Sequence, residues 1–579
     1  TSDNPRTESV QQIIGDIMQG FDPVEQILTE TDRQQAIYKT LNMAKADDVV
    51  FIAGKGHEDY QILGQKRIFF DDRAEGLNGL LRWNIPHLLR ALQGATIKRQ
   101  EKRHALFGQI STDTRTLSSG DIFVALAGEN FDGHDYLKTA VEAGAAAVIV
   151  QQERVGATDR SLPGHVVVLK VADTLLALGQ LAAYRRRLLQ RNLPLIAMTG
   201  SCGKTTVKET TAAIFQRHFK ELGETPTGVD PVLKTKRNFN NLIGLPLSLL
   251  PVTALHKIAI MEMGMNRFGE IKDLTAIADP DIGCITNVQA AHLEGLGSIQ
   301  GVARAKGELF AGMRSDTVAV VNYDDPLVRR LPKKSEKIIG FACTAAGRRY
   351  KPAVRATRIQ DLGAEGMRFT LHIKDRQERI NVPVPGLHTV SNCLAAAATA
   401  HAGRVAPESI VKALSEFRST DKRMQMITLP GGVQVLNDCY NANPASMAAA
   451  LRTVSGFGHN CRHIALLGDM LELGAEAETA HTEIGRLAAE LGYDQLAVTG
   501  KFAGQVAQGA RQAGMREEQV HVFTDTRSMA DRLYQEMIQG RIRADDWLLL
   551  KGSRGMRMEA VLQEIEHRFA TGITGSNEK

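Results

Sequence analysis

The chain has 579 residues, a formal net charge of +5, 43% hydrophobic residues and 23% charged residues. This length is too great for one hydrophobic core, so we expect three or four domains of ordinary globular composition. The small net charge argues against a nucleic-acid-binding surface, and we expect the basic clusters at 98–104 and 185–187 to be solvated helix faces. No apolar run reaches the roughly 18 residues of a membrane span, so we expect no membrane-spanning segment.

The N-terminus and the cysteines indicate a compartment. The chain opens with TSDNPR, which has neither the charged nor the apolar region of a signal peptide. Because residue 1 is not methionine, we expect a fragment of something longer. Six cysteines are scattered without a C-x-x-C pair, which suits reduced thiols better than disulfides or a zinc site. These features predict a cytoplasmic protein.

The first third of the chain alternates helical and strand patterns, which is typical of α/β folds. We divide it into a partial α/β domain at 1–84, a linker at 85–104 and an α/β domain at 105–190. The linker is expected to be helical and to end in charge. The expected helices are 9–21, 32–44 and 135–145, and the expected strands are 47–56 (short, buried and ending in a glycine turn), 121–128 and 146–151.

Two further α/β regions follow, a central domain at 191–418 and a C-terminal domain at 419–579. The strands of the C-terminal domain are continuous apolar runs, which favour parallel sheets covered on both faces. The predicted fold class is therefore a multi-domain α/β protein. The expected strands are 193–199, 258–264, 282–288, 463–469, 495–500 and 545–553, and the expected helices are 207–219, 392–403 and 407–417.

The segment AMTGSCGKTT at 197–206 resembles a phosphate-binding loop that lacks one glycine, because Met198 stands where G-x-x-x-x-G-K-[ST] begins. A predicted strand precedes this loop and a predicted helix follows it, so backbone N–H groups and the helix N-terminus can point at an anion. Gly200 and Gly203 allow the backbone to approach phosphate oxygens. Lys204 would reach the β- and γ-phosphates of ATP, and Thr205 would ligate Mg²⁺.

Three further polar residues occupy places where such a site needs them. Glu262 ends a predicted strand, where a Mg²⁺ ligand is useful in a doubly wound fold. His292 lies in a polar loop just after another strand, and Lys306 is expected at the start of a helix. Each of them alone could be an ordinary structural residue, so only their combination carries an argument.

In order and spacing, TGSCGKTT (199–206), MEMG (261–264), TNVQAAHLE (286–294) and AKGE (305–308) resemble the Mur ligase family. The loop of that family, T-G-[TS]-x-G-K-T-T, lacks the same glycine, so Met198 supports the site. The resemblance implies a central parallel-sheet ATPase domain with a phosphate loop, flanked by an N-terminal UDP-binding domain and a C-terminal Rossmann-like domain. It also implies a role in peptidoglycan synthesis, and hence in cell shape and division.

From about residue 105 onward, the chain resembles the members that add D-alanyl-D-alanine to UDP-MurNAc-tripeptide. The matching segments are 111–136, RNFNNLIGLPLSLL (237–250), NDCYNANPAS (437–446), LGDMLELG (467–474) and KGSRGMRME (551–559). In these members ATP phosphorylates a carboxylate, and an amine attacks the resulting acyl phosphate. Cations must offset the repulsion between carboxylate and triphosphate.

The resemblance assigns site residues. The catalytic set would be Lys204, Glu262, His292 and Lys306, with Thr205 and Glu262 on one Mg²⁺ and His292 and a carbamylated Lys306 near a second. An unmodified Lys306 that pairs with a carboxylate or phosphate is the alternative. ATP would be held by Thr199, Gly200, Ser201, Cys202, Gly203, Lys204, Thr205, Thr206, Asn322, Asn392, Arg423 and Asp438. Arg115, Asp132, Asn240 and Asn241 would face the UDP-sugar peptide, and Asn441, Asn443, Ser553 and Arg554 would face the dipeptide.

Three positions depart from the family pattern. Thr389 in GLHTVSN stands where the family usually has asparagine, and Asn437 replaces the first acid of D-D-x-Y-N-A-N-P. Arg237 stands where a small residue is expected. The roles of these three positions are therefore open.

Residues 1–84 resemble a different type, the members that add meso-diaminopimelate. TSDNPRTE, DRQQAI and IAGKGHEDYQ are similar to the second half of their C-terminal domain. The resemblance implies a vestigial diaminopimelate motif of Asp3, Asn4, Pro5, Arg6 and Glu58, in which a guanidinium fork suits a carboxylate. We interpret the chain as a fusion of two ligases from which only the tail of the first remains, and we expect this tail to be inert.

The principal hypothesis is an ATP- and Mg²⁺-dependent ligase that joins UDP-MurNAc-tripeptide to D-Ala-D-Ala as a monomer, without nucleic acid or a membrane span. A tripeptide ending in meso-diaminopimelate is expected from the tail. The alternatives are a diaminopimelate-adding enzyme, a noncatalytic scaffold for wall-synthesis enzymes, and a nucleotide hydrolase without ligase activity. Docking of other wall-synthesis enzymes in addition to catalysis stays open.

Overall fold

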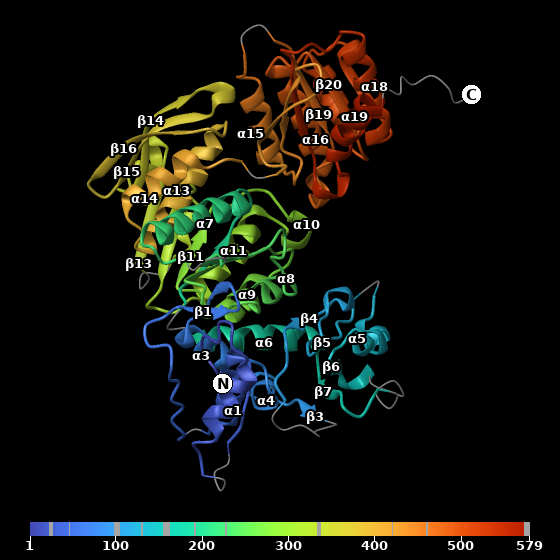
Figure 1. Ribbon diagram of the computed structural model, residues 1–579. Helices are drawn as coiled ribbons and strands as arrows, with labels where there is room; N and C mark the ends of the chain where they lie inside the picture. Colours follow the sequence, from blue (N-terminus) through green and yellow to red (C-terminus); the bar gives the residue numbers. More distant parts are fainter. Residues whose placement is uncertain are drawn as a thin grey trace. The chain divides into compact units, whose positions relative to one another are not determined.

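The computed structural model divides the chain into two compact units (Figure 1). The first unit comprises Thr1–Leu195, Phe219–Met261 and Asp273–Pro280, and the second comprises Ile196–His218, Glu262–Lys272 and Asp281–Lys579. The residues that the structure describes are 1–22, 27–45, 47–97, 105–128, 131–154, 162–189, 193–225, 229–332, 337–419, 421–458 and 461–571.

The first unit begins with helices and a small hairpin and continues into a five-stranded sheet of order β3-β7-β6-β5-β4. Strands β4 to β7 run parallel, and β3 pairs antiparallel with β7. The core of this sheet is apolar, with Phe123, Val148 and Val168 buried. The elements are α1 (Val10–Met18), α2 (Arg33–Met43), β1 (Tyr60–Leu63), β2 (Lys66–Phe69), α3 (Asp72–Leu80), α4 (Ile85–Ala91), β3 (Thr96–Ile97), β4 (Ile110–Ser111), β5 (Ile122–Val124), α5 (Leu137–Glu142), β6 (Ala147–Gln151), β7 (Val167–Val171) and α6 (Thr174–Leu189).

The central part of the chain builds a nine-stranded sheet of order β16-β15-β14-β13-β12-β11-β8-β10-β9, most of it in the second unit. Strands β11 to β14 are parallel, whereas β14, β15 and β16 form an antiparallel meander. Helix α13, rich in alanine, packs against β11 to β15, because small side chains let a helix lie close to a sheet. The elements are β8 (Leu195–Thr199), α7 (Lys204–Glu221), β9 (Val232–Lys234), α8 (Gly244–Leu249), β10 (Ile258–Glu262), α9 (Glu270–Ala278), β11 (Ile282–Ile285), α10 (Leu293–Leu296), α11 (Ile299–Gly312), β12 (Val318–Asn322), β13 (Lys337–Ala342), α12 (Ala345–Arg348), β14 (Val354–Asp361), β15 (Met367–Ile373), β16 (Arg376–Val382), α13 (Leu387–Ala402) and α14 (Pro407–Glu416).

The second unit ends in a six-stranded sheet of order β17-β18-β22-β19-β20-β21. All its pairs are parallel except β17–β18, so the predicted strands at 463–469, 495–500 and 545–553 are confirmed as β19, β20 and β22. The elements are β17 (Gln425–Thr428), β18 (Gln434–Asn437), α15 (Pro444–Val454), β19 (His463–Leu467), α16 (Ala477–Glu490), β20 (Gln495–Thr499), α17 (Ala503–Gln512), β21 (Val520–Phe523), α18 (Thr526–Ile538), β22 (Trp547–Lys551) and α19 (Glu559–Thr571).

The strand predicted at 47–56 is wrong. Residues 47–56 form neither helix nor strand, and the side chains of Val49 and Phe51 are 93% and 88% exposed. Only Ile52 packs against the small cluster of Ile37, Tyr38 and Phe70. A parallel strand needs hydrogen-bonded neighbours and cover on both faces, whereas the described part of 1–84 supplies only the antiparallel pair β1–β2.

The basic cluster at 185–187 is not a solvated helix face. Arg186 is 1% exposed and donates from its guanidinium to the carbonyl oxygens of Leu193, Ala278 and Asp279 at 2.9, 3.0 and 3.1 Å. Arg185 is also buried, with its guanidinium carbon 4.6 Å from the centre of the Trp83 ring. Burial lowers the pKa of Arg185 to about 10. The sequence pattern did not distinguish these packed arginines from surface ones.

The connector predicted at 85–104 is helical for less of its length than expected. Asn84 caps α4 by accepting a hydrogen bond from the backbone of His87 at 2.8 Å, and Pro86 follows at a position that favours helix starts. The helix ends at Ala91 and β3 follows. The basic residues at 98–104 lie outside the described residues, so the prediction of a solvated face is not tested there.

We expect the substitution Phe51→Ser to change the free energy of unfolding by about 0.5 kcal/mol or less, because the ring is already in water. The matched substitution Phe70→Ala removes a buried ring of the same region and should cost about 3–5 kcal/mol. Urea unfolding curves of both variants measure the difference. Equal destabilisation by the two would mean that 47–56 is a buried strand after all.

Candidate active site

A glycine turn joins β8 to α7. Thr199 ends the strand and Lys204 begins the helix, as the sequence predicts for a phosphate loop. A Cβ atom at Gly200 would lie 1.9 Å from Oγ1 of Thr286, and one at Gly203 would lie 2.3 Å from Oδ1 of Asn392. The turn is therefore packed so closely that neither position admits a side chain without movement.

The segment that follows β11 holds this turn. Asn287 accepts from the N–H of Cys202 at 2.9 Å through its side-chain oxygen, and donates to the Cys202 carbonyl at 3.1 Å. The hydroxyl of Thr286 donates to the same carbonyl at 2.7 Å, and Ser201 exchanges hydrogen bonds with Gln289. The sequence analysis missed this role of Asn287, although its position within TNV, directly after a strand, was a usable signal.

Thr205 and Glu262 come together as predicted. The Thr205 hydroxyl donates to a carboxylate oxygen of Glu262 at 2.8 Å, and the glutamate is 2% exposed at the end of β10. A guanidinium nitrogen of Arg423 donates to the Thr205 hydroxyl at 2.8 Å, and this guanidinium stacks 3.8 Å over the ring of Tyr440. A hydroxyl beside a buried carboxylate offers the two oxygen donors that Mg²⁺ commonly takes from a protein, so these residues fit that ion.

Two lysines lie near this pair. The ammonium of Lys204 donates to the Gly200 carbonyl at 2.7 Å, and burial lowers its pKa against the attraction of Glu262. Lys306 is in the interior of α11 and not at the start of a helix, so that part of the prediction is wrong. Burial, followed by repulsion from Lys204, lowers the pKa of Lys306 well below its usual range. The helix begins before AKGE because Ser298, eight residues before Lys306, caps the N-terminus of α11.

His292 lies after β11, as predicted, and begins the short helix α10 with φ 56°. Its Nδ1 is 2.6 Å from a carboxylate oxygen of Glu472, which lies in the loop after β19 and also has a positive φ, 64°. The hydrogen bond from His292 lowers the pKa of Glu472. Glu472 belongs to the quoted motif LGDMLELG, but the sequence analysis gave it no role.

The other residues predicted to bind ATP contact neighbouring protein groups. Asn322 is buried and donates to the Thr286 carbonyl at 2.8 Å, and Asn392 lies against Gly203. Asp438 is paired with Lys551 and accepts from the Met424 N–H at 3.1 Å. Asn392 therefore lies against the phosphate loop, and Asn322 bonds to Thr286 beside it. Asp438 instead forms an ion pair with Lys551 of β22.

The residues expected to face the dipeptide are held in several ways. Asn443 caps α15, and its amide nitrogen lies 3.0 Å from Sγ of Cys202. The Asn441 carbonyl accepts from Lys551 at 3.1 Å, and the Ser553 hydroxyl accepts from the Leu471 N–H at 2.9 Å. Arg554 is paired with Glu559. Of this set, Asn443 is the member that contacts the phosphate loop.

In the first unit, the residues expected to face the UDP-sugar peptide are placed separately. Arg115 is paired with Asp113 at 2.7 Å, and Asp132 pairs with His134 and Arg154. Asn241 accepts from the N–H of Gly244 at 2.8 Å and so fixes the start of α8, next to Asn240.

Two of the three departures have local roles, whereas nothing in the structure explains the arginine at 237. Arg237 has φ 51°, a left-handed backbone that suits a small residue better. Thr389 is buried in α13 and donates to the Pro385 carbonyl at 2.9 Å, and Asn437 is buried at the end of β18. Both side chains are therefore buried within their own domains, and that of Thr389 bonds to the backbone one turn earlier in the chain.

The N-terminal motif is assembled. The side chain of Asn4 donates to Glu58 at 3.1 Å and accepts from the Ile62 N–H at 2.8 Å, which brings DNPR against GKGHE. Asp3 is paired with Lys55 at 2.7 Å. Pro5 is buried, whereas Arg6 is exposed with φ 54°.

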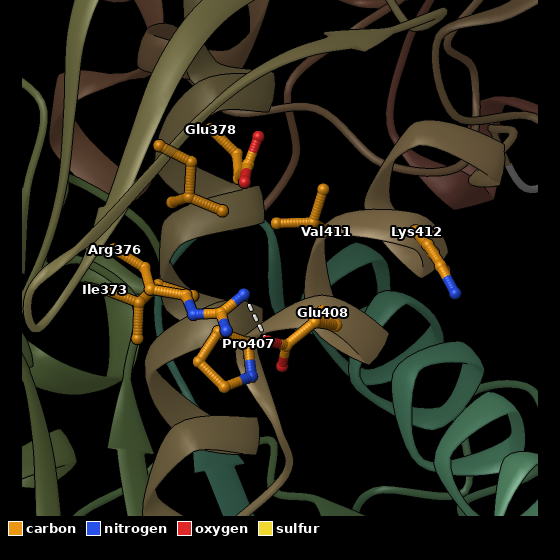
Figure 2. Close-up of a pocket in the computed structure, with 8 residues that line it drawn as sticks. Ile373, Arg376, Glu378, Pro407, Glu408, Val411 and Lys412 are labelled. Atoms are coloured by element: carbon orange, nitrogen blue, oxygen red, sulfur yellow. Dashed lines mark ion pairs between the residues drawn. The ribbon is translucent and has the colours of Figure 1, made fainter.

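A separate cavity of about 170 Å³ lies between the β15–β16 hairpin and α14 (Figure 2). Figure 2 shows the ion pair of Arg376 with Glu408 across it. Its apolar wall includes Ile373, Pro407 and Val411. No residue of the predicted site lines this cavity, so it is not the nucleotide site.

Within the described ranges, no helix is long and apolar enough to cross a membrane, and no three His, Cys, Asp or Glu side chains gather as a metal-binding group. The fold and site define an α/β protein with a phosphate loop and an adjacent hydroxyl–carboxylate pair.

Three family models match the chain. They are described as "Mur ligase family, catalytic domain" (107–186), "Mur ligase middle domain" (198–400) and "Mur ligase, glutamate ligase domain" (422–554). The UDP-N-acetylmuramoyl-tripeptide–D-alanyl-D-alanine ligase of Bacillus subtilis (strain 168) is 34% identical over 84% of this chain and 99% of its own length. The enzyme of the same name from Escherichia coli (strain K12) is 35% identical over 79% and 93%.

Solved structures agree with these relatives. A crystal structure of MurF from Acinetobacter baumannii is 32% identical, with a TM-score of 0.72 over 84% of this chain and 99% of that one. MurF from Thermotoga maritima in complex with ADP is 23% identical, with a TM-score of 0.66 over 80% and 98%, and is similar in fold. The chain belongs to the Mur ligase family.

We expect the substitution Gly200→Ala to destabilise the protein by about 1–3 kcal/mol, because the new methyl group would overlap the Thr286 hydroxyl. The matched substitution Gly164→Ala enters open space and should have little effect. Thermal unfolding of the two variants makes the comparison. An unchanged unfolding temperature for Gly200→Ala would show that the loop can move away from Thr286.

Proposed function

We propose that the chain ligates D-alanyl-D-alanine to UDP-MurNAc-tripeptide at the expense of ATP, in the synthesis of the peptidoglycan precursor. The observation that carries this proposal is the phosphate loop beside the buried pair of Thr205 and Glu262. The named ligases that this chain resembles over about four fifths of its length support the choice of substrates.

The reaction joins a carboxylate to an amine in two steps. A carboxylate oxygen of the tripeptide attacks the γ-phosphorus of ATP, which releases ADP and leaves an acyl phosphate. The amine of D-Ala-D-Ala then attacks the acyl carbon, loses a proton and expels phosphate. Both steps gather negative charge, which the cations of the site offset.

The residues of the loop divide this work. Backbone N–H groups of the turn from Thr199 to Thr206 and the N-terminus of α7 would bind the phosphates, and Lys204 would offset their charge. Thr205 and Glu262 would hold a Mg²⁺ ion, whose charge draws electron density from the transferred phosphoryl group. Asn322, Asn392, Arg423 and Asp438 would hold the rest of the nucleotide.

Lys306 supports a second cation site together with His292. Burial disfavours the charged form of this amine and lowers its pKa, and an amine that has lost its proton can take up carbon dioxide. The resulting carbamate is an anion able to ligate a metal. We propose this modification for Lys306, with the unmodified amine as the alternative.

We propose the domain boundaries 1–84, 85–104, 105–190, 191–418 and 419–579. The three matched family segments support the last three of these divisions. Arg115, Asp132, Asn240 and Asn241 are proposed for the UDP-sugar peptide. Asn441, Asn443, Ser553 and Arg554 are proposed for the dipeptide, Asn443 with the support of its contact to Cys202. The UDP-linked substrate and six free cysteines support a cytoplasmic location.

Residues 1–84 are proposed to derive from the C-terminal domain of a diaminopimelate-adding ligase fused to a second ligase. The contact of Asn4 with Glu58 supports this origin, because it joins the two halves of the expected motif. Residues 1–84 contain no phosphate loop, so we propose that this segment by itself is inert. The motif nevertheless supports a tripeptide that ends in meso-diaminopimelate.

Phosphate release from ATP tests the proposed function. With UDP-MurNAc-tripeptide in its meso-diaminopimelate form, we expect release that requires D-Ala-D-Ala and Mg²⁺. Chelation of Mg²⁺ should abolish the release, because the phosphates would lack their counter-charge. Hydrolysis of ATP without either substrate would favour a nucleotide hydrolase, and silence in every mixture would favour a scaffold.

We expect Lys204→Ala to lower the rate by about 10²–10³-fold, because an ammonium aimed at the phosphates is lost. Lys220→Ala serves as the matched control, since this lysine is exposed near the other end of the same helix. Steady-state kinetics of both variants measure the effect. Equal rates for the wild type and Lys204→Ala would remove Lys204 from the site.

We expect no turnover of UDP-MurNAc-dipeptide with free diaminopimelate, and no effect of Arg6→Ala on the D-Ala-D-Ala reaction. The reason is that residues 1–84 contain no phosphate loop. The same phosphate-release assay measures both. Turnover of the dipeptide, lost on Arg6→Ala, would assign diaminopimelate-adding activity to the N-terminal segment.

A further inference from the structure

We propose that Glu472 is a positioning residue for the ligase reaction, which fixes the ring of His292 so that its Nε2 lone pair faces the reacting groups. The proposal rests on the function proposed above. It assigns a task to the loop after β19, for which the sequence motif alone suggested none.

The contact joins two loops that are 180 residues apart in the sequence. His292 Nδ1 lies 2.6 Å from a carboxylate oxygen of Glu472. Near this contact, Gly474 lies against the backbone of Glu294, since a Cβ atom built on Gly474 would be 3.5 Å from the Glu294 Cα. The two loops therefore meet over several residues and not through one side chain alone.

The loop that presents Glu472 is anchored on both sides. The backbone N–H of Met470 donates to His481 at 2.9 Å, and that of Leu471 donates to Ser553 at 2.9 Å. Leu473 is buried directly after the glutamate. Because its neighbours are fixed, the backbone that presents Glu472 is held in place next to His292.

Both partners adopt a left-handed backbone, with φ 56° at His292 and φ 64° at Glu472. Residues other than glycine rarely adopt this conformation, and each instance costs of the order of 1–3 kcal/mol unless the surroundings stabilise it. Two such residues in direct contact indicate that the geometry of the pair is maintained at some expense of stability.

The contact with Glu472 determines which ring nitrogen of His292 carries the proton. A neutral ring carries one proton, and a carboxylate that accepts a hydrogen bond from Nδ1 keeps the proton there. Nε2 is then left with a free lone pair and the ring is held in one orientation, as in histidines that are oriented by a carboxylate behind them. Without Glu472, the proton can move to Nε2 and the ring can turn.

The closing experiment compares Glu472→Ala and Glu472→Gln with Glu476→Gln. Glu476 is an exposed glutamate of the same segment that starts α16 without a side-chain cap, so it serves as the matched control. Glutamine at 472 keeps an oxygen that can accept from Nδ1, whereas alanine removes it. The three variants thus separate the hydrogen bond from the general effect of substitution.

The first readout does not depend on activity. Histidines labelled with ¹⁵N, with His292 identified by its loss in His292→Gln, report which ring nitrogen carries the proton in the ligand-free enzyme. We expect the proton on Nδ1 in the wild type, Glu472→Gln and Glu476→Gln, and on Nε2 for the most part in Glu472→Ala. An unchanged distribution in Glu472→Ala would overturn the proposal, whether or not the chain proves to be the proposed ligase.

The second readout is the rate of ligation. We expect Glu472→Ala to lower kcat by roughly 10- to 100-fold with little change in KM for ATP, Glu472→Gln to recover much of the rate, and Glu476→Gln to match the wild type. In a His292→Gln background, Glu472→Ala should add almost nothing, because a positioning residue acts through its partner. Additive losses, or a loss restricted to attack by D-Ala-D-Ala with ADP formation intact, would overturn the proposal.

Discussion

The site depends on the hydrogen bonds that hold the backbone of the phosphate loop. A glycine turn has no conformation of its own, so its N–H groups can converge on phosphates only if something else fixes it. Here the fixed element is the end of β11, whose Thr286 and Asn287 both bond to the carbonyl of Cys202. The parallel register of β8 with β11 brings these residues beside the loop. Formation of the sheet therefore also sets the conformation of the anion-binding turn.

Positive charge exceeds negative charge around this turn. Lys204 and Arg423 lie near the buried carboxylate of Glu262, and Lys306 lies close enough to Lys204 to be repelled by it. In the free protein this excess is unfavourable: burial lowers the pKa of both lysines, with a further contribution from Arg423 at Lys204 and from Lys204 at Lys306. A triphosphate and a substrate carboxylate supply the missing negative charge, so the same imbalance that costs stability favours the binding of anions.

The sequence allowed prediction of features whose cause is local. The strand, glycine turn and helix at 195–221 follow from apolar runs and glycine spacing, and Glu262 follows from its place at a strand end. Features that depend on distant residues were missed. The interior position of Lys306 requires knowing that Ser298 starts the helix, and the buried Arg185 requires knowing that Trp83 packs on it. The hydrogen bond between His292 and Glu472 joins residues 180 positions apart, so no local pattern indicates it.

The segment at 47–56 has a consequence for the handling of the protein. Its residues VVFI are uncharged, favour β structure and are bounded by no proline, and two of them are almost fully in water. Such a run readily pairs with the same run of another chain. The protein should therefore self-associate as its concentration rises, through a part of the chain remote in sequence from the phosphate loop.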